Sequence, residues 1–254
     1  MDFTLKKYSE LVSALKDAGY EFVTYAEYAE GNRAERLVVM RHDVDRCIQG
    51  ARRMADVEQN MGIKASYYVR EKFLCKVDAI RHIADMGHEV GYHYEDLVTE
   101  RGDMNKAYAM CLCNINKLRQ VVDVRTITMH GSPLSRFDSR AIWQKYDYKK
   151  LGIIGEPQID VDWSDMVYLT DTGRSWNGIS RRDKVAERAE EWKAKGWVYE
   201  TTDDIIKAIQ EDRFPPRVMI TVHPQRWHIK TWRWALELVT QKVKNVVKWV
   251  LLKK

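Results

Sequence analysis

Short apolar runs followed by polar residues recur along the chain, and the first of them shows the pattern most clearly. Residues 37–40 read Leu-Val-Val-Met, and residues 41–46 read Arg-His-Asp-Val-Asp-Arg. Four consecutive apolar residues are typical of a strand that is buried on both faces, as in a parallel sheet. The charged residues would then lie at the carboxyl end of this strand, which is where α/β folds hold their functional groups.

The same kind of pattern predicts alternating helices and strands along the whole chain. Apolar residues at three- and four-residue steps indicate helices, and several of them end at a glycine. The predicted helices cover residues 4–19, 48–61, 77–86, 104–122, 202–210 and 231–252. The predicted strands cover residues 37–40, 65–69, 89–93, 126–129, 166–171 and 218–222. Because no linker interrupts this alternation, we expect a parallel sheet with right-handed crossovers in a single domain, 1–254.

The first turn separates two kinds of α/β fold. A doubly wound, nucleotide-binding sheet would carry glycines in the turn after its first strand, and residues 41–46 contain none. A closed or nearly closed barrel fits better. The chain has 254 residues, of which 45% are hydrophobic and 31% charged, and this is ordinary for such a barrel.

Composition also bears on location and redox state. The chain has no run of eighteen apolar residues, and its first residues lack an apolar segment behind their charges. We therefore expect a cytoplasmic protein that does not span a membrane. The four cysteines do not have the spacing of a disulfide scaffold, so we expect reduced thiols.

The positive charge is concentrated at the end of the sequence. The net charge of the chain is +5, and the segment 231–254 alone accounts for it. A nucleic-acid-binding surface would spread its charge over a face of the fold, so we expect no nucleic-acid partner. The predicted helix 231–252 carries an apolar stripe, which most often packs on the outer wall of a barrel. Its lysines and Trp249 also fit a helix that lies on an anionic membrane surface, and this alternative stays open.

Histidine or aspartate follows four different predicted strands. The residues are Asp43 and Asp45, His93, His130 and His223. In a parallel sheet the carboxyl ends of the strands meet at one rim, so these side chains are expected to converge on a shared site. Asp43 and Asp45 point to the same side if the strand continues through them, and two such carboxylates either bind a cation or perturb each other's pKa. A helix cap or solvated turn is the plainer interpretation of an isolated pair.

The sequence resembles the polysaccharide deacetylase family, also called the NodB-homology family. The resemblance rests on residues 42–45 (His-Asp-Val-Asp), 87–93 (Gly-His-Glu-Val-Gly-Tyr-His) and 221–224 (Thr-Val-His-Pro), and it covers about 37–224. It implies an irregular (β/α) barrel that removes N- or O-linked acetyl groups from sugars with the help of one divalent metal ion. Zinc is the first expectation, with nickel, cobalt or manganese as alternatives.

The chain departs from the family in its metal ligands. The family usually has adjacent aspartates, but here Val44 separates them; the resemblance assigns the catalytic base to Asp43 and a ligand to Asp45. A second ligand would be His93. The family usually has another histidine four residues later, where this chain has Leu97.

The missing ligand has several candidate replacements. His130 follows another strand and would restore an Asp-His-His set, whereas Glu95 and Asp96 are alternatives close to Leu97. If none of them binds the ion, the chain would be a catalytically degenerate barrel that binds carbohydrate or acts as a scaffold.

Acyl hydrolysis needs a polarised carbonyl, an activated water and an acid for the leaving group. A divalent ion with open positions supplies the first two needs. Asp43 would accept the proton of the water, and His223 would protonate the leaving nitrogen, because an imidazole pKa of about 6.5 suits this role. Arg41 or Arg174 would hold Asp43 or the substrate, although a surface ion pair is an equally ordinary role for each arginine.

The segment 171–176 (Asp-Thr-Gly-Arg-Ser-Trp) follows another predicted strand. Asp171 would orient a ligand histidine through a hydrogen bond to the ring nitrogen that does not face the metal. Trp176 would either stack on a sugar or anchor a loop in the core. The resemblance implies a sugar substrate. In a cytoplasmic protein this would be a lipid- or nucleotide-linked intermediate of surface polysaccharide biosynthesis.

Overall fold

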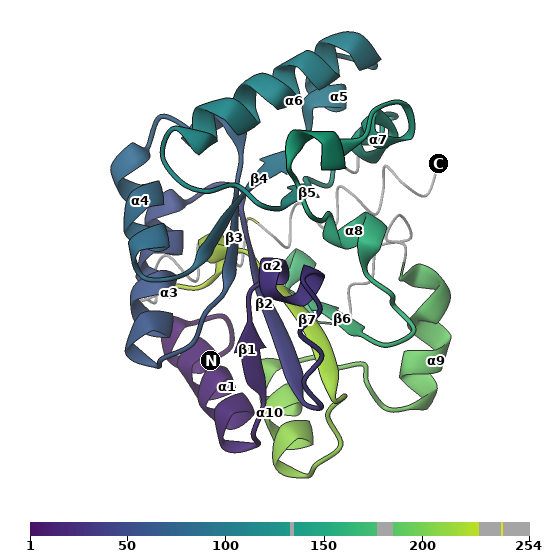
Figure 1. Cartoon of the computed structure of the whole chain (residues 1–254). Helices are drawn as coiled ribbons and strands as arrows, with labels where there is room; N and C mark the ends of the chain where they lie inside the picture. Colours follow the sequence, from purple (N-terminus) through teal and green to yellow (C-terminus); the bar gives the residue numbers. More distant parts are fainter. Residues whose placement is uncertain (133–134, 177–184, 229–239, 241–254) are drawn as a thin grey trace.

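A computed structural model describes residues 1–132, 135–176, 185–228 and 240 of the chain. These residues form a curved sheet with helices around it (Figure 1). Its hydrogen-bonded order is β5-β4-β3-β2-β7-β6, with β1 paired to β2, and every pair is parallel. The strands are β1 (Glu21–Val23), β2 (Leu37–Val44), β3 (Ser66–Val69), β4 (Glu89–Tyr94), β5 (Ile127–Met129), β6 (Val167–Thr170) and β7 (Arg217–Val222).

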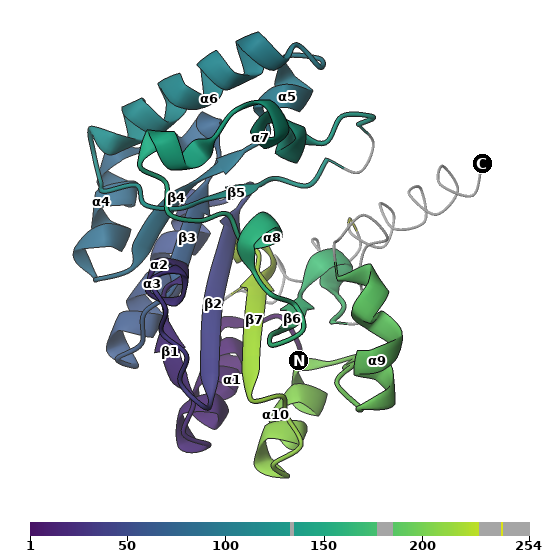
Figure 2. The ribbon, with the colours of Figure 1, turned by 45° about the vertical axis from the view of Figure 1, so that its right-hand side comes forward.

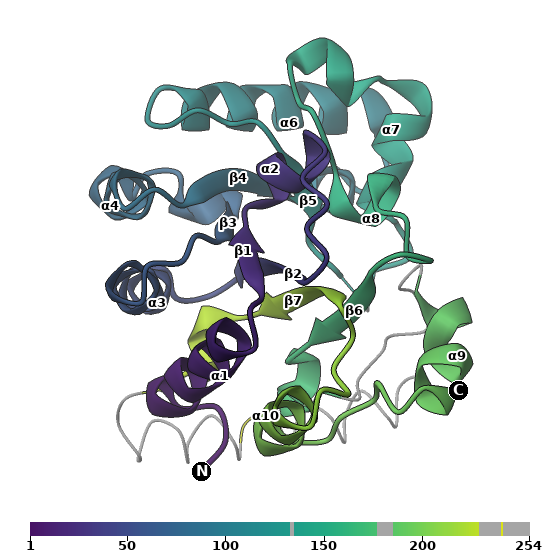
Figure 3. The ribbon, with the colours of Figure 1, turned by 60° about the horizontal axis from the view of Figure 1, so that its bottom comes forward.

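Helices cover both sides of the curved sheet. Figure 3 shows α1, α3, α4 and α10 along its outer side, whereas α2 and α8 lie on the opposite side. The helices are α1 (Leu5–Asp17), α2 (Tyr25–Ala29), α3 (Ile48–Asn60), α4 (Val77–Asp85), α5 (Asp96–Thr99), α6 (Met104–Arg119), α7 (Ile142–Lys145), α8 (Pro157–Asp160), α9 (Ala189–Ala194) and α10 (Thr202–Gln210). Apolar residues at helical spacing face the sheet, as Leu11 and Leu15 of α1 do, and both are fully buried.

The sheet is curled but not closed. Its edge strands β5 and β6 each pair with one neighbour, and among the described residues they do not pair with each other. The predicted α/β class and irregular barrel are therefore confirmed in the form of a parallel half-barrel. The expectation of a closed or nearly closed barrel is corrected, because the hydrogen-bonded path stops at both edges.

Strand β2 is the centre of this sheet and is longer than the predicted strand 37–40. It pairs with β1 over residues 37–39, with β7 over 37–42 and with β3 over 41–44, and Figure 2 shows β2 and β7 side by side. All eight of its residues are buried. The polar residues 41–43 thus belong to the strand itself, because bonded neighbours on both sides keep the backbone extended beyond the apolar run.

Two elements near the N-terminus were missed by the sequence interpretation. Residues 21–30 form β1 and α2, and α2 begins with a capping box between Thr24 and Glu27. Apart from residue 240, the predicted helix 231–252 lies outside the described residues, and so does the membrane contact predicted for it. Within the described part of the chain, no helix combines the length and apolar character needed to cross a membrane. All four cysteines are free thiols, as predicted.

Gly91 in the middle of β4 gives a stability prediction. A Cβ at this position would lie 2.5 Å from the Thr126 carbonyl oxygen and 2.5 Å from the Tyr68 ring. Because the first of these atoms is backbone, Gly91→Ala should lower the free energy of unfolding by about 2–3 kcal/mol, as overpacking of a core does. Urea denaturation measures this loss. Gly131→Ala is the control, because a Cβ there meets nothing within 4 Å. Equal unfolding midpoints for both variants would contradict the close packing around Gly91.

Candidate active site

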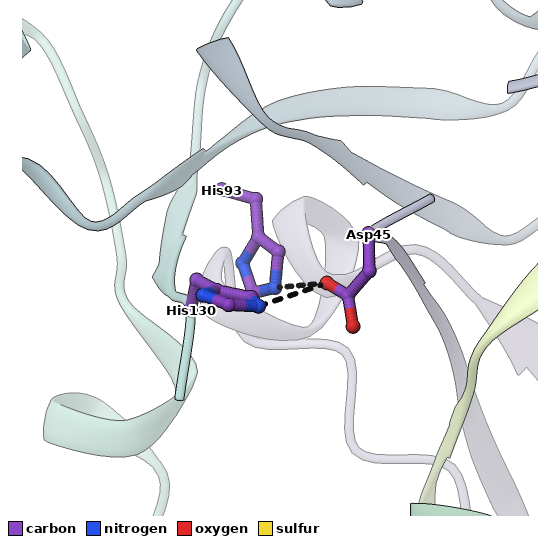
Figure 4. A group of neighbouring side chains, drawn as sticks. All are labelled: Asp45, His93 and His130. Carbon is purple, nitrogen blue, oxygen red and sulfur yellow. Dashed lines mark ion pairs between the residues drawn. The ribbon is translucent and has the colours of Figure 1, made fainter. Parts of the chain in front are cut away.

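Asp45, His93 and His130 meet at the carboxyl rim of the sheet (Figure 4). They come from the ends of β2, β4 and β5, so the parallel topology brings them together. Asp45 Oδ1 lies 3.4 Å from His93 Nε2 and 3.4 Å from His130 Nε2. One ligand atom from each residue lies within 4.8 Å of the other two, which is a candidate arrangement for one metal ion.

Hydrogen bonds on the far side of each imidazole determine which nitrogen faces the site. His93 Nδ1 lies 3.0 Å from the Thr128 carbonyl oxygen, which can only accept, so Nδ1 carries the proton. His130 Nδ1 lies 2.9 Å from Glu95 Oε2 and donates to that carboxylate. In the neutral rings the lone pair of each Nε2 is thus directed at Asp45, which is the form that binds a metal.

Asp45 provides a test of whether a cation fits between these residues. Its Oδ1 is buried and has no hydrogen-bond partner among the described residues. Burial opposes ionisation of this carboxyl, but the positive charge of protonated His93 and His223 outweighs that effect and holds its pKa well below the usual range. A cation bound in place of those protons would stabilise the carboxylate in the same way. A buried, ionised oxygen without a donor, next to two imidazole lone pairs, fits a divalent cation.

Asp43 lies beside this group and is fixed by Arg41. The guanidinium donates from Nε and Nη2 to the two carboxylate oxygens, each at 2.8 Å. Arg41 is only 1% exposed, so the pair is shielded from water. Burial tends to raise the pKa of Asp43, but Arg41 and the nearby His93 lower it overall. Asp43 Oδ2 is 3.6 Å from His93 Nε2, which places an ionised carboxylate at the edge of the candidate metal site.

His223 faces Asp45 from the end of β7, and Asp171 holds it from behind. Its Nδ1 is 2.5 Å from Asp171 Oδ1, and its Nε2 is 3.7 Å from Asp45 Oδ2. Asp171 is fully buried and also accepts hydrogen bonds from Arg226 and from the Trp227 indole. Burial opposes its ionisation, yet Arg226 and His223 lower its pKa. Asp171 therefore fixes the ring and leaves Nε2 facing the site.

The opposite face of β2 carries a second polar group. His42 Nε2 is 2.7 Å from the buried Glu58 of α3, and both residues are completely buried. The hydroxyls of Tyr8 and Tyr67 donate to the same carboxylate, and the His42 ring stacks on Tyr67 with 4.1 Å between the ring centres. His42 thus points away from the site, as its place between Arg41 and Asp43 in a strand predicts.

Two predicted substrate-binding residues pack against Phe3. Trp176 is 2% exposed, donates its indole N–H to Thr202 and packs against Phe3. This placement supports the loop anchor and not the stacking on a sugar, because the ring is covered. The guanidinium of Arg174 lies 5.1 Å from the centre of the Phe3 ring. The third predicted residue, Arg41, is bound to Asp43. Holding Asp43 is one of the two roles predicted for this arginine.

Three contributors to the site were not found from the sequence. Glu95 is an alternative metal ligand in the sequence analysis, but in the structure its carboxylate accepts a hydrogen bond from His130 and forms an ion pair with Arg70. Arg226 and Trp227 were not predicted as part of the site, although they come two and three residues after Pro224, the last residue of the 221–224 motif. Their closeness to His223 in the sequence was the one indication of this role. In the structure, the short 3-10 helix Pro224–Arg226 turns the chain back towards Asp171, and both side chains donate to its carboxylate.

Comparisons with known proteins show likeness only in structure. Neither a protein-family model nor a curated protein matches the chain. One similar structure is a peptidoglycan N-acetylglucosamine deacetylase in complex with an N-oxidanyl-benzamide, with 13% identity, a TM-score of 0.47, and coverage of 92% of this chain and 91% of that one. Another is the catalytic domain of such a deacetylase from Eubacterium rectale, with 14% identity, a TM-score of 0.42, and coverage of 84% and 87%.

A pseudoenzyme of carbohydrate esterase family 4 from Bacillus anthracis is also similar. It has 13% identity and a TM-score of 0.43, and 84% of this chain matches 63% of that one. The chain likewise spans 65% of a mutant of this pseudoenzyme with restored activity. The similar structures are thus carbohydrate deacetylases and their pseudoenzymes, the family that the sequence motifs resemble. Identities and TM-scores this low leave the function to be inferred from this chain's own residues.

Proposed function

We propose that this protein is a metal-dependent hydrolase that removes an acetyl group from a sugar. One observation carries the proposal: an Asp-His-His group with both Nε2 lone pairs directed inward lies next to an ionised carboxylate, Asp43, and an imidazole, His223. This combines a metal-binding set with a base beside His93 and an acid beside Asp45. A barrel that had lost catalysis would have no need to keep both proton-transfer groups.

Asp45, His93 and His130 would hold the ion. A divalent ion bound there would supply Lewis acidity towards the acetyl carbonyl and the attacking water. Zinc suits one carboxylate and two imidazoles, and nickel, cobalt and manganese accept the same donors. The hydrogen bonds of His93 to the Thr128 carbonyl oxygen and of His130 to Glu95 keep the donor atoms in place before anything binds.

Asp43 is the proposed general base. Each of its oxygens keeps a lone pair beyond the bond to Arg41, so the carboxylate can accept a proton from water. Arg41 prevents the side chain from turning away, and it keeps Asp43 ionised at neutral pH because it lowers the pKa. As the water oxygen attacks the acetyl carbon, its proton moves to Asp43.

His223 is the proposed general acid. Its Nδ1–H is bound by Asp171, so a proton carried on Nε2 is directed at the site. When the bond between the acetyl carbon and the sugar nitrogen breaks, Nε2 gives its proton to that nitrogen, and acetate and an amine result. With an O-acetyl substrate the proton goes to the leaving oxygen. The carriers predicted for the sugar, a lipid or a nucleotide, stay predictions.

Acetate release tests the proposed reaction. The metal-loaded protein is incubated with N-acetylglucosamine oligomers, a nucleotide-linked N-acetylglucosamine and an O-acetylated xylan oligomer, and acetate is measured enzymatically. We expect release from at least one of them, loss of release with a chelator, and recovery when metal is added back. Asp45→Ala should be inactive, because it removes the buried ligand oxygen.

Two outcomes would overturn the proposal. Stoichiometric metal binding without acetate release from any acetylated sugar would favour a carbohydrate-binding barrel. Acetate release that a chelator does not affect would exclude the metal-dependent reaction.

A further inference from the structure

His130 stands at the exposed side of the candidate metal site and depends on two charged neighbours. Arg70, Glu95 and His130 follow the last residues of β3, β4 and β5, three adjacent strands. His130 Nδ1 lies 2.9 Å from Glu95 Oε2, and Arg70 forms an ion pair with the other oxygen, Oε1. The backbone amide of His130 also donates to the Tyr94 carbonyl oxygen at 2.8 Å, which fixes where the side chain begins.

The two ligand imidazoles are supported in different ways. His93 is 1% exposed and bonds to a backbone carbonyl, whereas the His130 side chain is 17% exposed and bonds to a carboxylate. A ring near solvent on an edge strand has more freedom to rotate and to change tautomer. A carboxylate behind it removes that freedom, and it also makes the ring a stronger donor to a metal.

The other candidates for the third ligand are engaged elsewhere. Both oxygens of Glu95 are taken by His130 and Arg70. Asp96 is 1% exposed and accepts hydrogen bonds from Tyr92 and Asn114. Leu97 is 3% exposed and packs in a separate apolar cluster with Ala107 and Ile142.

We infer that Glu95, held by Arg70, is a positioning residue that makes His130 the third metal ligand in place of residue 97. The inference rests on the proposed metal site and deepens it. Glu95 binds no metal itself; it keeps the proton of His130 on Nδ1, so that Nε2 faces Asp45 and His93.

Zinc titration of the metal-free protein against a chromophoric chelator tests this role. Glu95→Ala should weaken zinc binding by about 100-fold, and Glu95→Gln, which keeps an acceptor for the Nδ1–H, by about 10-fold. Glu100→Gln is the matched control, because it removes a carboxylate from the end of the same short helix, α5, and should leave the affinity unchanged.

Nitrogen NMR of the His130 ring in the metal-free protein gives a second, independent measurement. We expect one tautomer, protonated at Nδ1, in the unaltered protein and in Glu95→Gln, and a mixture of tautomers in Glu95→Ala. A purely structural role of Glu95 would change the unfolding midpoint without changing this equilibrium.

The two proposals fail in different ways. If the unaltered protein binds zinc and Glu95→Ala binds it equally well with the same tautomer, the positioning role is overturned and the metal site stands. If the unaltered protein binds neither zinc nor nickel, cobalt or manganese, the proposed function is overturned, and an unchanged tautomer in Glu95→Ala would then overturn the positioning role as well.

Discussion

Asp43→Asn is expected to lower turnover by a factor on the order of 10² to 10⁴ while the metal content stays the same. The amide cannot accept a proton from water as the carboxylate does. Asp43 is not part of the Asp45, His93 and His130 group, so the ion should remain. Acetate release at saturating substrate measures turnover, and elemental analysis of the same sample measures the metal.

The Asp43 variant needs a control for folding. Arg41 would lose a bidentate partner inside the protein, and breaking a buried ion pair costs about 3–5 kcal/mol. His223→Ala avoids this problem, because Asp171 keeps its bonds to Arg226 and Trp227. We expect the same range of turnover loss and full metal content for His223→Ala. Loss of metal in a folded variant, or normal turnover in both, would contradict the assigned roles.

His130→Ala should lower metal occupancy as strongly as His93→Ala does. Both substitutions leave two ligands of a three-residue set, and the ligand atoms of the two histidines are equally close to Asp45. Elemental analysis after dialysis against a weak chelator measures the occupancy. If His130→Ala keeps its metal while His93→Ala loses it, the third ligand is another residue, with Glu95 the nearest candidate.

A second substitution makes the same experiment sharper. The family pattern suggests that His130→Ala should be rescued by Leu97→His, which restores a histidine where the family usually has one. We expect no rescue, because the Leu97 side chain is buried in the apolar cluster with Ala107 and Ile142. Recovery of metal in the double variant would show that position 97 reaches the site.

The sequence predicted the sheet well where strands are apolar. The runs at 37–40 and 218–222 became β2 and β7, because fully buried strands need apolar residues on both faces. It missed β1 and α2, which are short and rich in aromatic and polar residues. Their local signal, the capping box of Thr24 and Glu27, was present but not used. Whether the barrel closes was not predictable from periodicity, because closure depends on whether the two edge strands pair with each other.

The site was predictable where residue type and strand end coincide. Asp45, His93 and His130 were placed together on that basis, and the structure brings their ligand atoms within 4.8 Å of one another. Their role in binding metal stays a prediction. The partnership of Glu95 with His130 was not predictable, because it depends on the register that sets Tyr94 opposite Met129. Burial of Trp176 depends likewise on packing between distant segments.

The placement of the ligands across the sheet has a mechanical consequence. β5 is a three-residue strand that forms a ladder with β4 and, on its other side, has an isolated bridge between Thr126 and Gly155, whereas β2 forms ladders with strands on both sides. Edge segments of this kind open locally with far less free energy than the centre of a sheet. An ion held by Asp45, His93 and His130 would link β4 and β5, at the edge of the sheet, to β2 in its middle. The amides of β5 would then exchange their hydrogens with solvent more slowly as the ion concentration rises, so the metal would act on the sheet as a cross-link as well as on the substrate.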